Sequence, residues 1–139
     1  MSLAGKLHPL LVHFPIALVL SSAAAELAAI RTRRAGWHAL AVDNLRAGAA
    51  MAVVAVIAGW ALAEAPFIEA SSALELHRWT GVAATAATSA AVFASRRSDI
   101  QSRRSVRAYR GALFGAAVLI AIAGHLGAAL VWGAEFLTK

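Results

Sequence analysis

Four long stretches without a charged side chain constrain the fold of this chain more than any other feature. They are Leu7 to Ala25, Ala47 to Ala63, Trp79 to Ser95 and Gly111 to Ala134. A helix needs about 17 to 25 apolar residues to cross about 30 Å of hydrocarbon, and each stretch falls in that range. The sequence therefore predicts an all-α integral membrane protein with four transmembrane helices.

The composition and the spacing of the stretches predict how the helices are arranged. Of the 139 residues, 60% are hydrophobic, whereas a soluble domain has about 45–50%. The length allows one domain, residues 1–139, with helices at about 7–30, 43–64, 76–95 and 108–134. Short connections predict an up-down-up-down four-helix bundle in which the first helix also touches the fourth. The first stretch lacks the flanks of a signal peptide and is interpreted as a retained helix.

Most of the positive charge lies in the connections between the apolar stretches. The net charge is +6, and most arginines lie in residues 31–34 and 96–110. This is the distribution of a membrane topology signal, so nucleic acid is not an expected partner. The positive-inside rule places these loops in the cytoplasm of a bacterial inner-membrane protein, and both termini and the Glu64 to Glu75 loop on the periplasmic side. An attraction to anionic lipid or an acidic partner is a second interpretation of the same arginines.

Tryptophan positions agree with this topology. Trp60, Trp79 and Trp132 fall at the predicted outer ends of their helices, as in an interfacial aromatic belt.

The histidines are the candidate ligands of a cofactor. The chain has no cysteine, which excludes disulfides, thiolate metal sites, iron–sulfur clusters and covalently attached haem. His8 and His77 open the first and third predicted helices at the outer surface. At the helical rise, His13 lies about 7.5 Å below His8, and His125 lies about 10 Å below Trp132.

Two pairs of histidines follow from these depths. His13 and His125 are expected at similar depth on adjacent helices, which is the arrangement of two axial ligands of a b-type haem. His8 and His77 are expected to hold a second haem or a smaller metal ion, with Glu75 or Glu64 beside them. The alternatives are another metal at either pair, a hydrated His8, and a His13 bonded to a backbone carbonyl.

Two further polar residues and one proline have simpler interpretations. Glu26 is expected to end the first helix at the inner interface and to pair with Arg46, a proton path being the alternative. His38 lies in the inner loop with no predicted partner. Pro15 removes an amide donor and frees the carbonyl of Leu11, so a kink is expected near the start of the first helix.

The motif His8-Pro9-Leu10-Leu11-Val12-His13-Phe14-Pro15-Ile16-Ala17-Leu18, with Gly124-His125-Leu126-Gly127 and Leu130-Val131-Trp132-Gly133, resembles a bacterial family. That family is catalogued as domain of unknown function 2231. The resemblance implies a four-helix membrane protein, and some members are joined to Rieske or cytochrome c type redox modules. It also implies that His8, His13, His77 and His125 match the family's histidines. An electron donor or acceptor would then be a separate protein or a quinone.

Two hypotheses of function follow. The first is a small b-type cytochrome, binding one or two haem b groups in the outer half of the bundle and transferring electrons. The second is a non-catalytic subunit of a larger membrane complex or homo-oligomer, whose histidines are structural or bind a non-haem metal. No nucleophile elbow, P-loop, dinucleotide fingerprint or H-E-x-x-H motif is present, so no catalytic activity beyond electron transfer is expected.

Overall fold

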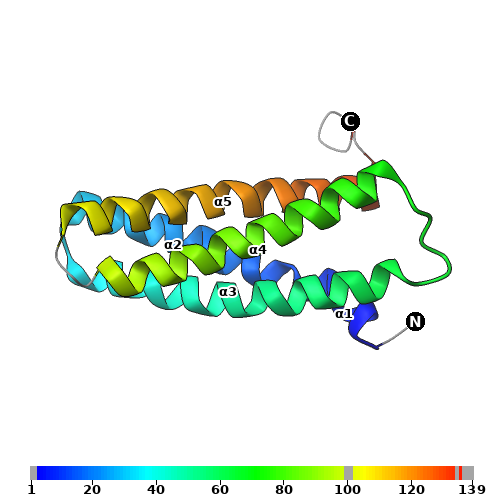
Figure 1. Cartoon of the computed structure of the whole chain (residues 1–139), viewed down its shortest axis with the longest axis horizontal. Coiled ribbons are helices and arrows are strands. Elements are labelled where there is room, and N and C mark those ends of the chain that lie inside the picture. The colour runs from blue at the N-terminus through cyan, green and yellow to red at the C-terminus, as the bar shows by residue number, and fades with distance from the viewer. Residues whose placement is uncertain (1–2, 99–101, 134, 136–139) are drawn as a thin grey trace.

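The computed structural model describes residues 3–98, 102–133 and 135, and these residues form helices joined by turns. The helices are α1 (Leu3–Leu11), α2 (His13–Thr32), α3 (Ala35–Ala63), α4 (Ser72–Ser98) and α5 (Arg103–Trp132). α2 to α5 run lengthwise beside one another as an elongated bundle (Figure 1). We call the end with α1, the α3–α4 loop and the last turn of α5 the histidine end. The opposite end, with the α2–α3 and α4–α5 connections, is the arginine end.

α1 and α2 form one membrane-length helix with a break. The two helices are separated only by Val12. Pro15 has no amide hydrogen, and its ring collides with the carbonyl of Leu11, four residues earlier, which disrupts the helix at that turn. The interruption predicted near the start of this helix is therefore confirmed.

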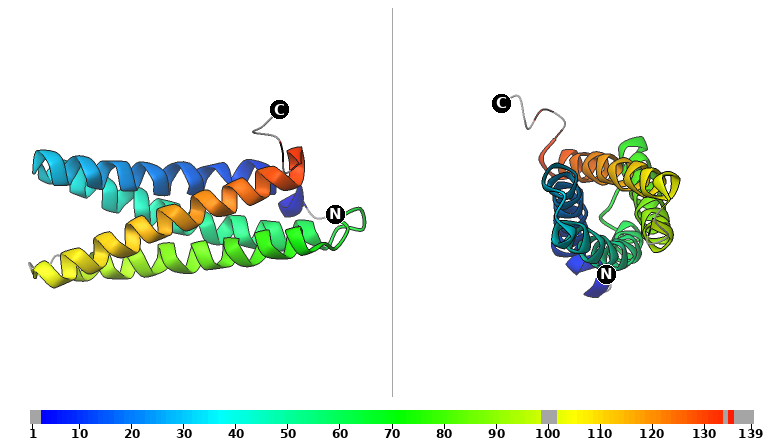
Figure 2. Two further views of the ribbon diagram at one scale, coloured as in Figure 1. Left: turned by 90° about the horizontal axis from the view of Figure 1, so that it is seen from above. Right: turned by 90° about the vertical axis from the view of Figure 1, so that its left-hand side faces the viewer.

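The four long helices close into a ring. α2 packs on α3 and α4 packs on α5 as two helical hairpins, and further contacts join α3 to α4 and α2 to α5. Seen along its axis, the bundle has these helices at the corners of a square (Figure 2). The predicted contact between the first and last long helices is confirmed, because the short connections make successive helices antiparallel neighbours.

The bundle is built with small residues inside and large apolar residues outside. Many of the fully buried positions are alanine, among them Ala41, Ala84 and Ala116. Phe93 and Ile57 are more than 60% exposed, with many other large apolar side chains on the outer face. A soluble bundle buries its largest apolar residues, whereas small residues at the interfaces and apolar residues facing outward are typical of helices in lipid.

Three helical stretches are long and apolar enough to cross a membrane. They are Gly5–Thr32, Ala35–Ala63 and Arg103–Trp132 in the described part of the chain. α4 is as long as its neighbours, but the threonines and serines of its Ala-rich run lower its hydropathy, so a fourth crossing stays a prediction. The four long helices also extend further at the arginine end than predicted, and the added residues of α2, α4 and α5 include arginines, which are good helix formers outside the hydrocarbon.

The two hairpins share one pattern of interior positions. For each pair of matching helices, residues of the first hairpin match residues of the second that lie a constant number of positions later in the sequence. Between α1–α2 and α4 the matching pairs are His8 and His77, Pro15 and Ala84, Val19 and Thr88, Ser22 and Ala91, and Glu26 and Ser95. Along α3 and α5 they are Ala41 and Tyr109, Leu45 and Leu113, Gly48 and Ala116, Ala52 and Ile120, and Ala55 and Ala123. Every pair except the two histidines, which are half-buried, is buried in both hairpins. The two hairpins thus bury the same positions along their helices, as the halves of an internal structural repeat do.

Candidate functional site

His8 and His77 each bond to the second helix of their own hairpin. Nδ1 of His8 lies 2.9 Å from the carbonyl oxygen of Ala55, and Nδ1 of His77 lies 3.1 Å from that of Ala123. A carbonyl oxygen only accepts, so each Nδ1 carries the hydrogen and donates it. In the neutral imidazole this leaves the lone pair on Nε2, which is the nitrogen available to a metal or a hydrogen-bond donor.

Each of these rings also lies against a glycine, which is one turn beyond the bonded alanine on the helix of that alanine. A Cβ on Gly59 would lie 2.8 Å from Cε1 of His8, and a Cβ on Gly127 would lie 2.9 Å from Cε1 of His77. Real Cβ atoms essentially never come so close, so only glycine leaves room for the rings in these positions. The same carbonyl-plus-glycine seat is therefore built twice, once in each hairpin.

The repeat brings the two rings together at the histidine end. The ring centroids of His8 and His77 are 6.4 Å apart and the planes are inclined by 71°. Beside them, Trp60 and Trp79 meet edge to face at 6.1 Å, and the Arg78 guanidinium lies 3.7 Å from the Trp60 ring centre. A cation over an indole face is an attractive contact. The histidine pair is thus accompanied by an aromatic and cationic cluster.

The pair His13 and His125 has a different environment. Gly124 lies against Ile16, where an added Cβ would be 3.0 Å from the Ile16 side chain, so α2 and α5 meet at this level. Both His13 and His125, however, are exposed on the outside of the bundle. The structure therefore supports a common level for these two histidines and does not enclose them between helices, and their role as ligands stays a prediction.

In the described part of the chain, no carboxylate joins His8 and His77 as the third ligand of a metal site. No group of three His, Asp or Glu side chains there could hold a metal ion together. Glu64 and Glu75 are exposed. Among these residues the structure therefore shows no three-ligand site that joins His8 and His77 to a glutamate, and a metal or haem held by the two histidines stays a prediction.

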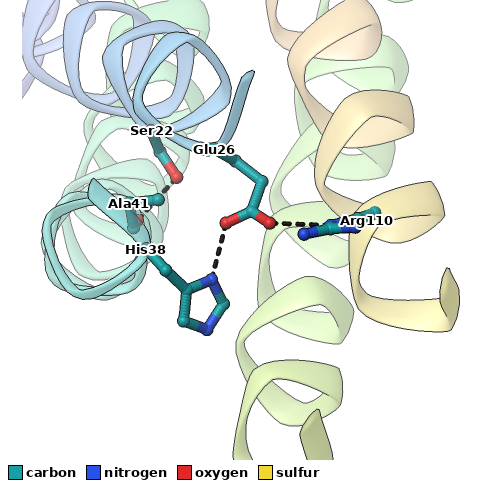
Figure 3. Close-up of polar contacts among 5 residues, drawn as sticks. All are labelled: Ser22, Glu26, His38, Ala41 and Arg110. Atoms are coloured by element: carbon teal, nitrogen blue, oxygen red, sulfur yellow. Dashed lines mark hydrogen bonds and ion pairs between the residues drawn. The ribbon is translucent and has the colours of Figure 1, made fainter. Parts of the chain in front are cut away.

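A second polar cluster lies inside the bundle near the arginine end. The side chain of Glu26 is fully buried, with Oε2 2.6 Å from Nδ1 of His38 and Oε1 2.8 Å from Nε of Arg110 (Figure 3). One turn earlier, the Ser22 hydroxyl donates to the carbonyl of Ala41 at 2.6 Å. A buried carboxylate is stable only when its charge is compensated, and here two cationic or donating side chains supply this.

The predicted ion pair between Glu26 and Arg46 was wrong. Arg46 lies 3.7 Å from Asp43 on the exposed side of α3, so it does not reach Glu26. His38, for which no partner was predicted, bonds to the carboxylate directly. The signal that could have identified Arg110 was the predicted contact between the first and last helices, since both residues lie near the arginine end of those helices.

The Tyr109 ring completes this cluster. It is fully buried and stands edge-on to His38, with ring centroids 5.4 Å apart and planes at 88°. The cluster of Glu26, His38, Tyr109 and Arg110 thus ties α2, α3 and α5 together at the arginine end.

The apolar exterior, the alanine interior and the three membrane-length stretches define an integral membrane protein built as a helical bundle. The family model described as "Predicted membrane protein (DUF2231)" matches residues 5–139, and the chain belongs to that family. This confirms the resemblance inferred from the histidine and proline motif. No curated protein and no solved structure matched the chain.

Proposed function

We propose that this protein is a small membrane electron carrier in which His8 and His77 ligate the iron of a b-type haem. The observation that supports the proposal is the paired seat of the two rings, each with Nδ1 bonded to a carbonyl and Nε2 left as the ligating nitrogen. The bonds to Ala55 and Ala123 fix the tautomer and the ring orientation and make each imidazole a better ligand.

The distance between the rings fits two ligands of one metal. Two metal–nitrogen bonds of about 2 Å, plus about 1 Å from each nitrogen to its ring centre, span about 6 Å across a bis-imidazole centre. The observed separation of the centroids is 6.4 Å. Bound in this way, haem supplies one-electron chemistry, while the protein holds the iron and sets its surroundings.

The other residues define the remaining parts of the proposal. Trp60 and Trp79 cover the histidine end, and a quinone or a separate redox protein would exchange electrons there. One haem is proposed, because His13 and His125 are exposed, and their role as ligands of a second haem stays a prediction that the variants below test. By the charge of its loops, the protein lies in the bacterial inner membrane with the arginine end in the cytoplasm.

The test is an absorption spectrum of protein purified from haem-replete cells, with a pyridine haemochrome assay. We expect a Soret band that shifts on addition of dithionite and is lost in His8→Gln and His77→Gln. Glutamine can still donate to the carbonyl of Ala55 or Ala123 but is a poor iron ligand, so the bundle should keep its stability. His13→Gln and His125→Gln serve as matched controls and should keep the band.

Each opposite result has a defined meaning. Loss of the band in His13→Gln and His125→Gln, with the band kept in the other two variants, would move the site to the exposed pair. A colourless wild-type protein would refute haem binding at both pairs.

A second candidate function is supported by the same bonds. Each histidine ties its own hairpin together through a carbonyl and a glycine, which is also what a purely structural clamp requires. In this case the protein is a non-catalytic subunit that packs its apolar outer face against a larger complex or another copy. His8→Ala and His77→Ala, which remove these bonds, would then lower only the melting temperature of a colourless protein.

A further inference from the structure

A basic pocket opens at the arginine end, where α2 ends, α3 begins and α5 passes beside them. Its volume is about 400 Å³. It is lined by Ala29, Ile30, Arg33, Arg34, Ala35, His38 and Arg110. The pocket lies at the opposite end of the bundle from the histidine pair, so its function is independent of the proposed haem.

The lining carries a strong excess of positive charge. Three of the seven lining residues are arginines, one is a histidine, and none is acidic. Arg110 uses Nε for its bond to Glu26, which leaves the two terminal nitrogens of the guanidinium for another acceptor. The buried Glu26 carboxylate offsets one positive charge, and the charges of Arg33 and Arg34 remain.

The start of α3 adds to this field. The N-cap residue, Arg34, makes no side-chain capping bond, and the first turn of the helix has no acidic residue. A long helix carries partial positive charge at its N-terminus through amide groups that lack intrahelical acceptors. Ala35, the first residue of this helix, lines the pocket.

The pocket also lies where lipid headgroups would be. Two membrane-length helices meet there, because one ends at Thr32 and the next starts at Ala35. Ile30, a lining residue, is 40% exposed, and Trp37, next in sequence to the lining residue His38, is 41% exposed, so apolar surface is available at this end of the bundle. Exposed apolar side chains beside clustered arginines suit a molecule with an anionic head and acyl chains.

We propose that this pocket binds the phosphate of an anionic phospholipid from the leaflet at the arginine end. Arg33, Arg34 and the terminal nitrogens of Arg110 hold the phosphate, and the acyl chains lie over Ile30 and Trp37. Basic pockets between transmembrane helices are a known mode of binding for anionic headgroups. This role is more specific than a topology signal, because it requires the arginines at one place rather than anywhere in the loops.

The test is a lipid titration of the purified protein in a neutral detergent, followed by native mass spectrometry and by tryptophan fluorescence, with Trp37→Phe to identify the contribution of Trp37. The probes are phosphatidylglycerol, phosphatidylcholine and inorganic phosphate. We expect phosphatidylglycerol to bind at least about 10-fold more tightly than phosphatidylcholine, since each arginine near an anionic headgroup contributes several-fold.

Two variants and a control test the position of the site. Arg33→Gln/Arg34→Gln should reduce the preference for phosphatidylglycerol to about 2-fold or less, if each arginine contributes as expected. Ala35→Glu should do the same while keeping the helix stable, because an acid in the first turn complements the helix dipole. Arg103→Gln/Arg104→Gln removes the same charge from the other connection and should leave the preference unchanged.

Three results would overturn the proposal. Equal binding of both lipids would show that the pocket does not recognise the anionic head. An equal loss in Arg103→Gln/Arg104→Gln would show that only the general charge matters. Inorganic phosphate bound as tightly as phosphatidylglycerol would show that the ligand is a soluble anion rather than a lipid.

Discussion

The ion pair between Glu26 and Arg110 should be the most sensitive polar contact in the bundle. We predict that Arg110→Gln lowers the free energy of unfolding because it leaves a fully buried carboxylate without its guanidinium. Removing one partner of a buried ion pair costs about 3–5 kcal/mol. The Arg110 side chain is 37% exposed, so water screens part of the interaction, and His38 still bonds to the other oxygen. We therefore expect a loss of about 2–3 kcal/mol.

The assay is unfolding in mixed micelles with increasing SDS, followed by tryptophan fluorescence. Arg107→Gln is the matched control, since it removes the same charge from an exposed position one turn earlier on α5. The double variant Glu26→Gln/Arg110→Gln should recover much of the stability, with a coupling free energy of about 1–3 kcal/mol. The reasoning is refuted if Arg110→Gln costs no more than Arg107→Gln, or if the two changes in the double variant are additive.

The remaining predictions concern backbone and packing positions. Gly59→Ala and Gly127→Ala should each cost about 1–3 kcal/mol in the same assay, because the new methyl group displaces a histidine ring, whereas Gly111→Ala meets open space and should be neutral or stabilising. Arg33 has a φ of 56°, so Arg33→Gly should raise the stability by about 0.5–1 kcal/mol, and an unchanged or lower value would contradict this. The Ser102 side chain accepts from the amide of Ser105 at the start of α5, so Ser102→Ala should cost about 1 kcal/mol, measured against Ser102→Asp, which keeps the cap.

The candidate sites show which contacts could be predicted from the residues alone. The convergence of His8 and His77 followed from their positions at the starts of two helices that enter the bundle from the same end. The partner of Glu26 did not follow, because Arg46 and Arg110 are both near the right depth and only the rotation of each helix distinguishes them. Arg46 faces outward on α3, whereas Arg110 lies beside the buried Tyr109 on α5.

The distinction between depth along a helix and rotation of the helix also explains the outcome for His13 and His125. Depth can be counted along a helix at a constant rise per residue, and the packing of Ile16 on Gly124 agrees with the common level expected for His13 and His125. The direction of a side chain depends on how each helix is rotated against its neighbours. Both of these histidines proved to be exposed, and this could not be read from their spacing.

By itself, the sequence determined that the chain is a membrane protein made of long helices. This is because the length of each uncharged stretch and the positions of the arginines beside it depend only on residues close together in sequence. The tertiary structure decided which polar groups meet, since the alanine-lined interfaces set the rotation and separation of the helices. The contacts of Glu26 with Arg110 and His38, and those of the His8 and His77 rings with Gly59 and Gly127, therefore follow only from the packing of the helices.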